Sequence, residues 1–253
     1  MLTTYDRSSG FCVDRIEKKL FNRFLPRTLV LSFGAAGCNL ACKLCQNWDR
    51  IKPREMDNLA DAASPQSSAR ETASSGCRSV AFTYNDRVIF HEYAIDVFHD
   101  CHEVGVKTVA VTAGYVCEKP QTEFHRDMDA VNDDLKAFME AFYHPLTNSH
   151  LQPVLETLEY SNHHTNVWLE ITTLLIPARN DSEAGRQGLT RWVVEYLGPD
   201  VPLHFSTFLP DFKMLARHRI PSSTLSLARS IAMNKGLQNV DTGNLHVPAT
   251  KHP

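Results

Sequence analysis

Three cysteines that lie within eight residues are the first feature of this sequence suited to chemistry. Cys38, Cys42 and Cys45 follow the spacing C-x3-C-x2-C, and the stretch from Gly37 to Arg50 contains no fourth cysteine. Thiolates bind soft metals and hold iron–sulfur clusters. A cubane cluster has four irons, so three cysteine ligands leave one iron open to bind another molecule. The spacing therefore favours an open iron–sulfur cluster.

Two other uses of these thiols remain as alternatives. A structural zinc site takes four ligands, usually as two separate pairs. Its fourth ligand could come from a distant cysteine or from one of the twelve histidines. The three thiols could also be unrelated residues of one loop. Their spacing and their position after a predicted strand favour the cluster over both.

Charge and composition exclude several classes of protein. The chain of 253 residues has 26 basic and 29 acidic residues, so it lacks the basic excess of a nucleic-acid-binding protein. No apolar stretch is long enough to span a membrane, and the first thirty residues lack the apolar core of a signal peptide. Seven scattered cysteines do not resemble a disulfide framework. We therefore expect a cytoplasmic protein that binds neither nucleic acid nor membrane.

Short β-rich runs alternate with helical patterns along the chain. Strands are predicted at 28–33, 79–84, 106–112, 128–135, 166–177 and 201–208, with a last short one at 237–240. Helices are predicted within 57–76, ending at Gly76, and over 88–105, 151–164, 183–198 and 222–236. This alternation predicts an α/β protein with a mainly parallel sheet and right-handed crossovers. Both an open doubly wound sheet and a partial barrel fit it.

Polar residues gather where the predicted strands end. In both candidate folds chemistry occurs at the carboxyl ends of the strands. The cysteines follow the first strand, and the other polar residues near this edge or within the later strands are Asn85, Asp86, Thr112, Asp134, Lys136, Glu170, Thr172 and His204. The sequence therefore predicts one active edge that carries both the thiols and these side chains.

The cysteine motif after a first strand resembles the signature of the radical S-adenosylmethionine (SAM) superfamily. The longer stretch LSFGAAGCNLACKLCQNWD resembles the AmmeMemoRadiSam group, which is related to the pyruvate formate-lyase activating enzymes. The similarity continues in the same order through AFTYND, LKAFMEAFY and VWLEITTLLIP. It extends from about Asp14 to Asn244. The resemblance implies a single core domain, about 24–244, on a partial (βα)6-type parallel barrel with short extensions at both ends.

The same resemblance implies the cofactors and the partners. A [4Fe–4S] cluster on Cys38, Cys42 and Cys45 would bind the amino and carboxylate groups of SAM at its open iron. One electron would then cleave SAM to a 5′-deoxyadenosyl radical, which abstracts a hydrogen atom. The electron donor would be a flavodoxin or ferredoxin. Activating enzymes oxidise a glycine of a protein partner, so a protein substrate or an AMMECR- or Memo-type partner is also implied.

Several of the polar residues match positions that bind SAM in the activating enzymes. Asn85 and Asp86 match the place of the motif for the SAM amino group, and Lys136 after Asp134 suits the SAM carboxylate. Thr112 and His204 also match positions of the family, and the resemblance implies that they bind the cofactor. Each has a structural alternative: Asn85 or Asp86 could cap the following helix, and Lys136 could be a solvated residue.

Four positions depart from the pattern of the resembling proteins. Asp86 replaces a glutamate, Arg87 a proline, Ala113 an asparagine and Leu209 a histidine. These departures motivate a second hypothesis: a catalytically weakened relative that binds a cluster or a partner protein without cleaving SAM. A structural zinc-binding module is the third hypothesis.

Overall fold

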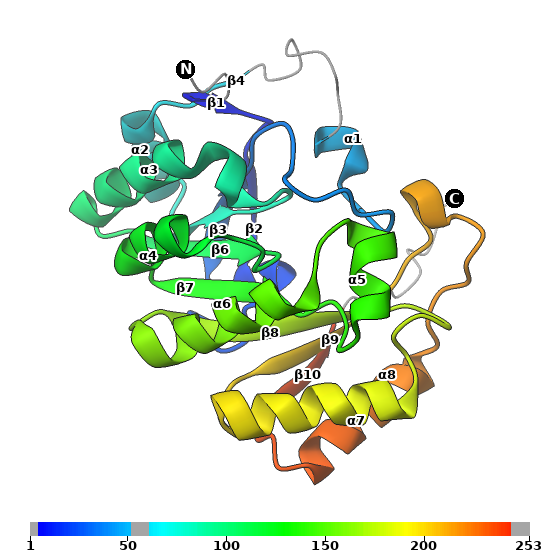
Figure 1. The fold of residues 1–253 in the computed structure, drawn as a ribbon. Coiled ribbons are helices and arrows are strands. Elements are labelled where there is room, and N and C mark those ends of the chain that lie inside the picture. Colours follow the sequence, from blue (N-terminus) through cyan, green and yellow to red (C-terminus); the bar gives the residue numbers. More distant parts are fainter. Residues whose placement is uncertain (1–4, 52–60, 244–253) are drawn as a thin grey trace, which may run out of the picture.

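An eight-stranded sheet forms the centre of the computed structural model, which describes residues 5–51 and 61–243 (Figure 1). The strand order is β10-β9-β8-β7-β6-β5-β3-β2. The strands are β2 (Cys12–Arg15), β3 (Leu29–Phe33), β5 (Ser79–Phe82), β6 (Lys107–Thr112), β7 (Ala130–Asp134), β8 (Trp168–Leu175), β9 (Leu203–Thr207) and β10 (Val240–Gly243). Neighbouring strands are parallel, except that β2 is antiparallel to β3.

This topology confirms the predicted α/β class with a mainly parallel sheet. In the described residues the sheet has two edges, β2 and β10, so the barrel is not closed. The predicted strands end within a few residues of the observed ones, apart from the last, since β10 begins where the predicted run 237–240 ends. A separate two-stranded ribbon pairs β1 (Arg7–Ser8) with β4 (Asp61–Ala62).

Helices connect the parallel strands and cover one face of the sheet (Figure 1). The α-helices are α1 (Trp48–Ile51), α2 (Pro65–Ser74), α3 (His91–Glu103), α4 (Glu118–Asp127), α5 (Glu140–Thr147), α6 (Leu151–His164), α7 (Glu183–Trp192) and α8 (Ser222–Asn234). A π-helical turn, η4 (Val193–Leu197), extends α7. The 3₁₀ turns of the described residues are η1 (Ile16–Lys19), η3 (Arg87–Phe90) and η5 (Phe212–Met214). No helix among the described residues is long and apolar enough to cross a membrane.

The predicted helices correspond to α2, α3, α6, α7 and α8, whereas α1, α4 and α5 were not predicted. Part of the stretch 57–76 lies outside the described residues, and α2 begins at Pro65 behind the side-chain cap of Ser64. Gly76 follows α2 with a φ of +69°, the left-handed conformation expected for a glycine after a helix. Helix α5 contains Pro145, which works against helix formation in the sequence.

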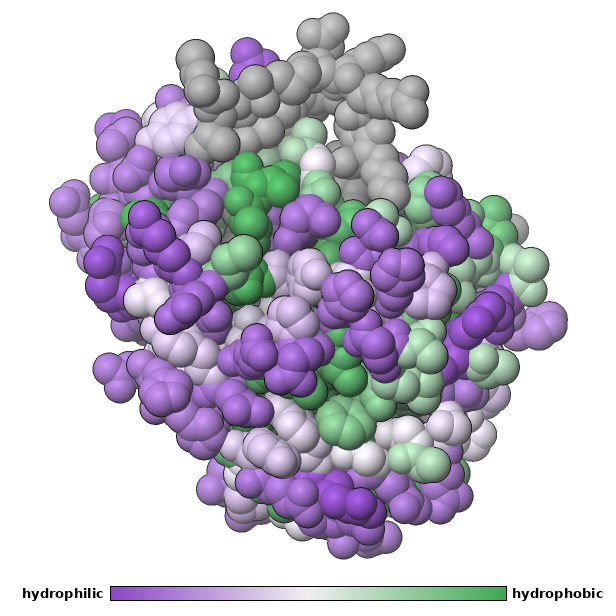
Figure 2. All heavy atoms as spheres, viewed as in Figure 1, coloured by the Kyte–Doolittle hydropathy of each residue, from purple (hydrophilic) through white to green (hydrophobic). Residues whose placement is uncertain are grey.

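The two faces of the sheet are buried in different ways. Alternate strand residues point to opposite faces, and those on the helix side, such as Phe33, Phe82 and Phe205, join one large apolar cluster. On the other face Val30 packs with Ile16 in a smaller cluster. Residues of η1 and of the segment after it thus cover part of the second face. In Figure 1, η1 is the blue turn behind the sheet. Over the helices the surface is mostly hydrophilic, with apolar side chains in the hollows between them (Figure 2).

Candidate active site

A cavity of about 930 Å³ brings the three cysteines together with the ends of the parallel strands. Small-molecule sites usually measure roughly 300–1,000 Å³, so this cavity lies at the upper end of that range. The described residues that line it come from the cysteine loop, the ends of β5, β6 and β7, the middle of β8 and β9, and the segment 14–20. Chemistry at the carboxyl ends of parallel strands is what the fold predicts.

The cysteine loop is anchored to the end of β5. The amide of Asn85 donates hydrogen bonds to the carbonyl oxygens of Ala35 (2.7 Å) and Gly37 (2.9 Å). Gly34 lies so close to this strand that an added Cβ would sit 2.3 Å from the carbonyl oxygen of Thr83. The sequence GAAG before Cys38 therefore permits a backbone approach that a side chain would prevent.

Helix α5 and η5 hold the other sides of the loop. The amides of Ala41 and Lys43 donate to the carbonyl oxygens of Thr147 (3.0 Å) and Leu146 (2.8 Å) at the end of α5. Trp48 donates from Nε1 to Asp211 Oδ1 (2.9 Å). Its ring stacks on that of Phe212 in η5, with the ring centroids 5.5 Å apart. The thiols thus stand on a loop fixed from three directions.

The three thiols are close enough to influence one another. Burial raises the pKa of the Cys42 thiol to about 11; the charge of Lys136 opposes this effect, whereas Cys38 and Cys45 act with burial. Iron binding must therefore displace a proton from the sulfur of Cys42. All three cysteines are partly buried and line the cavity.

The donor set fits a cubane cluster. Within the described part of the chain, no group of three His, Cys, Asp or Glu side chains is arranged to hold one metal ion. In a cubane each cysteine binds a different iron, so the three sulfurs do not have to converge on one point. Leu44, which is 6% exposed, packs in the apolar core directly before Cys45. Thiol ligands beside apolar packing match the surroundings of an iron–sulfur site.

Lys136 and Asp134 form a short ion pair on the wall of the cavity. The Lys136 Nζ lies 2.6 Å from Asp134 Oδ2, and the lysine is 9% exposed. Burial disfavours the charged ammonium, but Asp134 and Cys42 more than offset this, so the pKa of Lys136 lies above its ordinary value. The structure places both residues on the wall of the cavity that the three cysteines also line.

Asp86 and Thr112 tie the ends of β5 and β6 together. The Asp86 Oδ2 accepts hydrogen bonds from the Thr112 hydroxyl (3.1 Å) and the Ala113 amide (2.9 Å). Its Oδ1 accepts from the amide of Val88 (3.2 Å), so Asp86 also caps η3. Asn85, Asp86 and Thr112 all line the cavity. The capping role considered for Asp86 is thus observed, alongside a position in the site.

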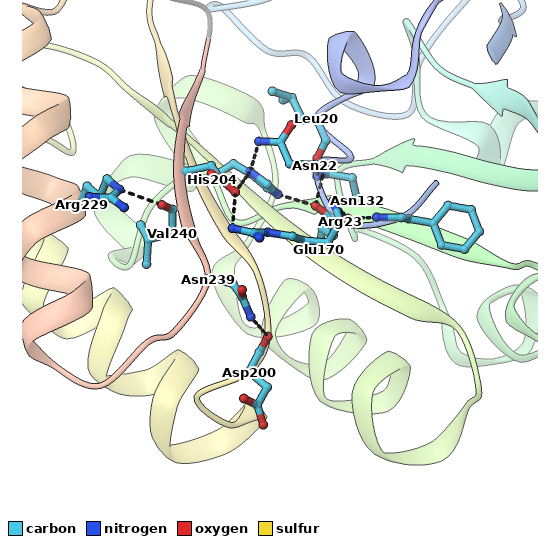
Figure 3. Close-up of polar contacts among 12 residues, drawn as sticks. Leu20, Asn22, Arg23, Asn132, Glu170, Asp200, His204, Arg229, Asn239 and Val240 are labelled. Atoms are coloured by element: carbon cyan, nitrogen blue, oxygen red, sulfur yellow. Dashed lines mark hydrogen bonds and ion pairs between the residues drawn. The ribbon is translucent and has the colours of Figure 1, made fainter. Parts of the chain in front are cut away.

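His204 lies elsewhere and is absent from the lining of this cavity. The histidine is 1% exposed, and its Nε2 is 2.6 Å from Glu170 Oε2. Glu170 also accepts the backbone amides of Asn22, Arg23 and Phe24 (Figure 3). The structure thus places His204 away from the other predicted site residues, where it holds a carboxylate that anchors the segment after η1. Its predicted contact with the cofactor stays a prediction. Thr172, two residues beyond Glu170, does line the cavity.

Sequence reasoning missed the wall that residues 14–20 contribute. Asp14, Lys18 and Lys19 lie on β2 and η1, and all three line the cavity. The strand and the turn are four residues each, too short for a periodic pattern. Ser206 on β9 also lines the cavity, two residues after His204.

Comparison with known proteins agrees with the site. Residues 34–186 match the family model of the radical SAM superfamily. An uncharacterized protein of Methanocaldococcus jannaschii is 32% identical over 248 residues, covering 95% of this chain and 71% of that protein. The chain belongs to the radical SAM superfamily. Radical SAM proteins use a [4Fe–4S] cluster and SAM, which confirms the two predicted cofactors, and they generally require an electron donor.

Solved structures of other proteins share the fold, among them one described as a radical SAM methyltransferase. A methyltransferase from Sphaerobacter thermophilus has a TM-score of 0.66 at 15% identity, covering 87% of this chain and 67% of that one. A domain of the pyruvate-formate lyase-activating enzyme from Bacteroides vulgatus has a TM-score of 0.56 at 16% identity, covering 65% and 98%. SuiB from Streptococcus suis, solved with S-adenosylmethionine, has a TM-score of 0.64 at 12% identity, covering 83% and 49%.

Proposed function

We propose that Cys38, Cys42 and Cys45 hold a [4Fe–4S] cluster and that SAM binds beside it in the cavity. The observation that carries this proposal is the arrangement of three thiols, on a loop fixed from three sides, at the rim of a cavity of about 930 Å³. Three cysteine ligands leave one iron for SAM. When bound, the two cofactors supply reductive cleavage of SAM to a 5′-deoxyadenosyl radical, which abstracts a hydrogen atom from the substrate.

Residues of the chain position these cofactors. Lys136 offers a buried cation to the SAM carboxylate, and Asp134, 2.6 Å from its Nζ, fixes the direction of the ammonium. Asn85 shapes the cysteine loop through its two carbonyl contacts. Leu44 and the apolar cluster that packs against Cys42 shield this side of the loop from water. Exclusion of water protects a reactive radical from side reactions.

The proposal extends to the subfamily and the partners. The cysteine stretch resembles the AmmeMemoRadiSam group, and the fold resembles a pyruvate-formate lyase-activating enzyme. We therefore assign the chain to that group, as one core domain of about 24–244. Its electron donor would be a flavodoxin or ferredoxin, and its partner a protein substrate or an AMMECR- or Memo-type protein.

One observation favours a second candidate, a relative that binds the cluster without cleaving SAM. The Asp86 carboxylate already accepts three hydrogen bonds, from Val88, Thr112 and Ala113. A carboxylate so engaged has less capacity left for the amino group of SAM. The two candidates share the cluster and differ only in turnover.

Anaerobic reconstitution followed by a SAM cleavage assay tests the proposal. The parent should hold about four irons per chain, and replacing Cys38, Cys42 and Cys45 together by alanine should remove them. Cys117→Ala, which alters an exposed cysteine, is the matched control and should retain iron. With dithionite and SAM, the parent should release 5′-deoxyadenosine.

Each other outcome has a definite meaning. A fully loaded cluster that yields no 5′-deoxyadenosine would support the weakened relative. One zinc per chain with no iron would refute both candidates and support a zinc module.

A further inference from the structure

The cavity wall formed by residues 14–20 carries a buried lysine that the proposed function does not use. Lys19 is 7% exposed and lines the same cavity as the three cysteines. A buried ammonium is costly unless strong partners compensate for the loss of water. The partners of Lys19 therefore indicate what this wall is built to bind.

The contacts of Lys19 are long for a buried cation. Its Nζ is 3.3 Å from Asp14 Oδ2 and 3.5 Å from the Tyr84 hydroxyl, and it lies 4.9 Å from the centroid of the Tyr84 ring. Charge-assisted bonds are normally about 2.7–2.9 Å. Asp14 has its short contact, 2.5 Å, with Lys18 instead. Asp14 thus stays paired when Lys19 turns to another anion.

Tyr84 is held in a strained backbone conformation. Its φ is +74°, which is unusual for a large aromatic residue. The amide of Asn47 donates to the carbonyl oxygen of Tyr84 (3.1 Å), and both residues line the cavity. Strain of this kind gathers at ligand-binding sites, where the surrounding structure maintains it. Here it brings an aromatic hydroxyl from the end of β5 to the lysine of η1.

The segment that carries Lys19 is firmly anchored. Asn132 donates from Nδ2 to the carbonyl oxygen of Leu20 (2.7 Å), directly after the lysine. Glu170 accepts hydrogen bonds from the backbone amides of Asn22, Arg23 and Phe24. Figure 3 shows Asn132 and Glu170, the two anchoring residues, side by side. A binding group on such a fixed segment loses little entropy when its ligand arrives.

We propose that Lys19 and Tyr84 bind an oxyanion of the substrate, either a carboxylate or a phosphate. The anion takes a short hydrogen bond from Lys19 Nζ and another from the Tyr84 hydroxyl, while Asp14 keeps its bond to Lys18. This inference rests on the proposed function, because the substrate must share the cavity with the cofactors. Lys136 and Lys19 then serve two different anions, one of SAM and one of the substrate.

Calorimetric titration of the reconstituted full chain, saturated with SAM, tests this site at constant ionic strength. The probes are inorganic phosphate and malonate, and a higher affinity for one identifies the source of the oxyanion. Lys19→Gln should weaken binding of the preferred probe by about 10- to 100-fold. Tyr84→Phe should weaken it by about 3- to 10-fold, and Lys19→Arg should restore most of the affinity.

Lys235→Gln is the matched control, since it removes the same charge from an exposed lysine that does not line the cavity. It should change the affinity by less than about 3-fold. The site is overturned if the parent and Lys19→Gln bind the probe equally well. It is also overturned if Lys235→Gln weakens binding as much as Lys19→Gln, because that result indicates unspecific attraction by positive charge. A parent that binds neither probe also overturns it. Iron content and SAM cleavage of the parent decide the proposed function separately.

Discussion

Replacing Glu170 by glutamine should destabilise the fold without touching the cysteine loop. The buried carboxylate accepts hydrogen bonds from three backbone amides at 2.9–3.1 Å, from Trp168 Nε1 at 3.0 Å and from His204 at 2.6 Å. Glutamine keeps one oxygen but presents an NH2 group where Oε2 stood. That group meets the amide of Asn22, which is then a buried donor without an acceptor.

Glu170→Gln should lower the free energy of unfolding by about 2–4 kcal/mol. A buried unsatisfied donor costs about 1–3 kcal/mol, and the remaining bonds fall from a charged to a neutral acceptor, which together removes roughly another 0.5–1.5 kcal/mol. His204 limits the loss, because a ring nitrogen can accept from the new amide.

The effect should depend on pH in the acid range. Burial alone would raise the pKa of Glu170, but the bonds from His204 and those from Phe24 and Trp168 more than offset it, so the pKa lies below the ordinary value of 4.5. A lowered pKa stabilises the folded state above the unfolded value, and this stability is lost as the pH falls through the folded value. The difference between parent and variant should be constant from about pH 6 to pH 8 and shrink below about pH 4.5.

Urea unfolding of the iron-free, reduced full chain, followed by far-ultraviolet circular dichroism, measures this difference. Glu195→Gln, at an exposed glutamate of η4, is the matched control and should change the free energy of unfolding by less than about 0.5 kcal/mol. If Glu170→Gln is as stable as the parent, or if the difference does not shrink in acid, the carboxylate does not anchor the segment after η1.

Three further changes test the cysteine loop and its neighbours. Lys136→Ala should leave the iron content unchanged and weaken equilibrium binding of SAM by about 10- to 100-fold, since a charge-assisted bond of about 1.5–3 kcal/mol is lost; unchanged SAM affinity would contradict its role. Cys42→Ala should remove iron first, as an iron assay after reconstitution would show, and full iron retention would exclude Cys42 as a ligand. Gly34→Ala should cost about 1–3 kcal/mol in thermal or urea unfolding, because the new Cβ would lie 2.3 Å from the carbonyl oxygen of Thr83; parental stability would show that β3 can move away.

The sequence by itself indicated the chemistry and the class of fold. The cysteine spacing is a local property, so C-x3-C-x2-C could be interpreted without coordinates. The parallel strands were predictable because both faces of such a sheet are buried, which produces apolar runs such as those around Val80 and Val109. Residues at the ends of these strands, including Lys136 and Thr112, were placed at the active edge by the same rule.

The tertiary structure alone decided which polar residues meet. His204 matched a family position, but its place beside Glu170 depends on how β9 aligns with β8, a register that no local pattern specifies. Lys19 and Tyr84 are 65 residues apart in the chain, and β2 and η1 are too short to show a periodic signal. Asn22 and Glu170 are separated by 148 residues. Contacts between such distant residues arise only when the chain closes on itself, and for that reason the second wall of the cavity appeared only in the structure.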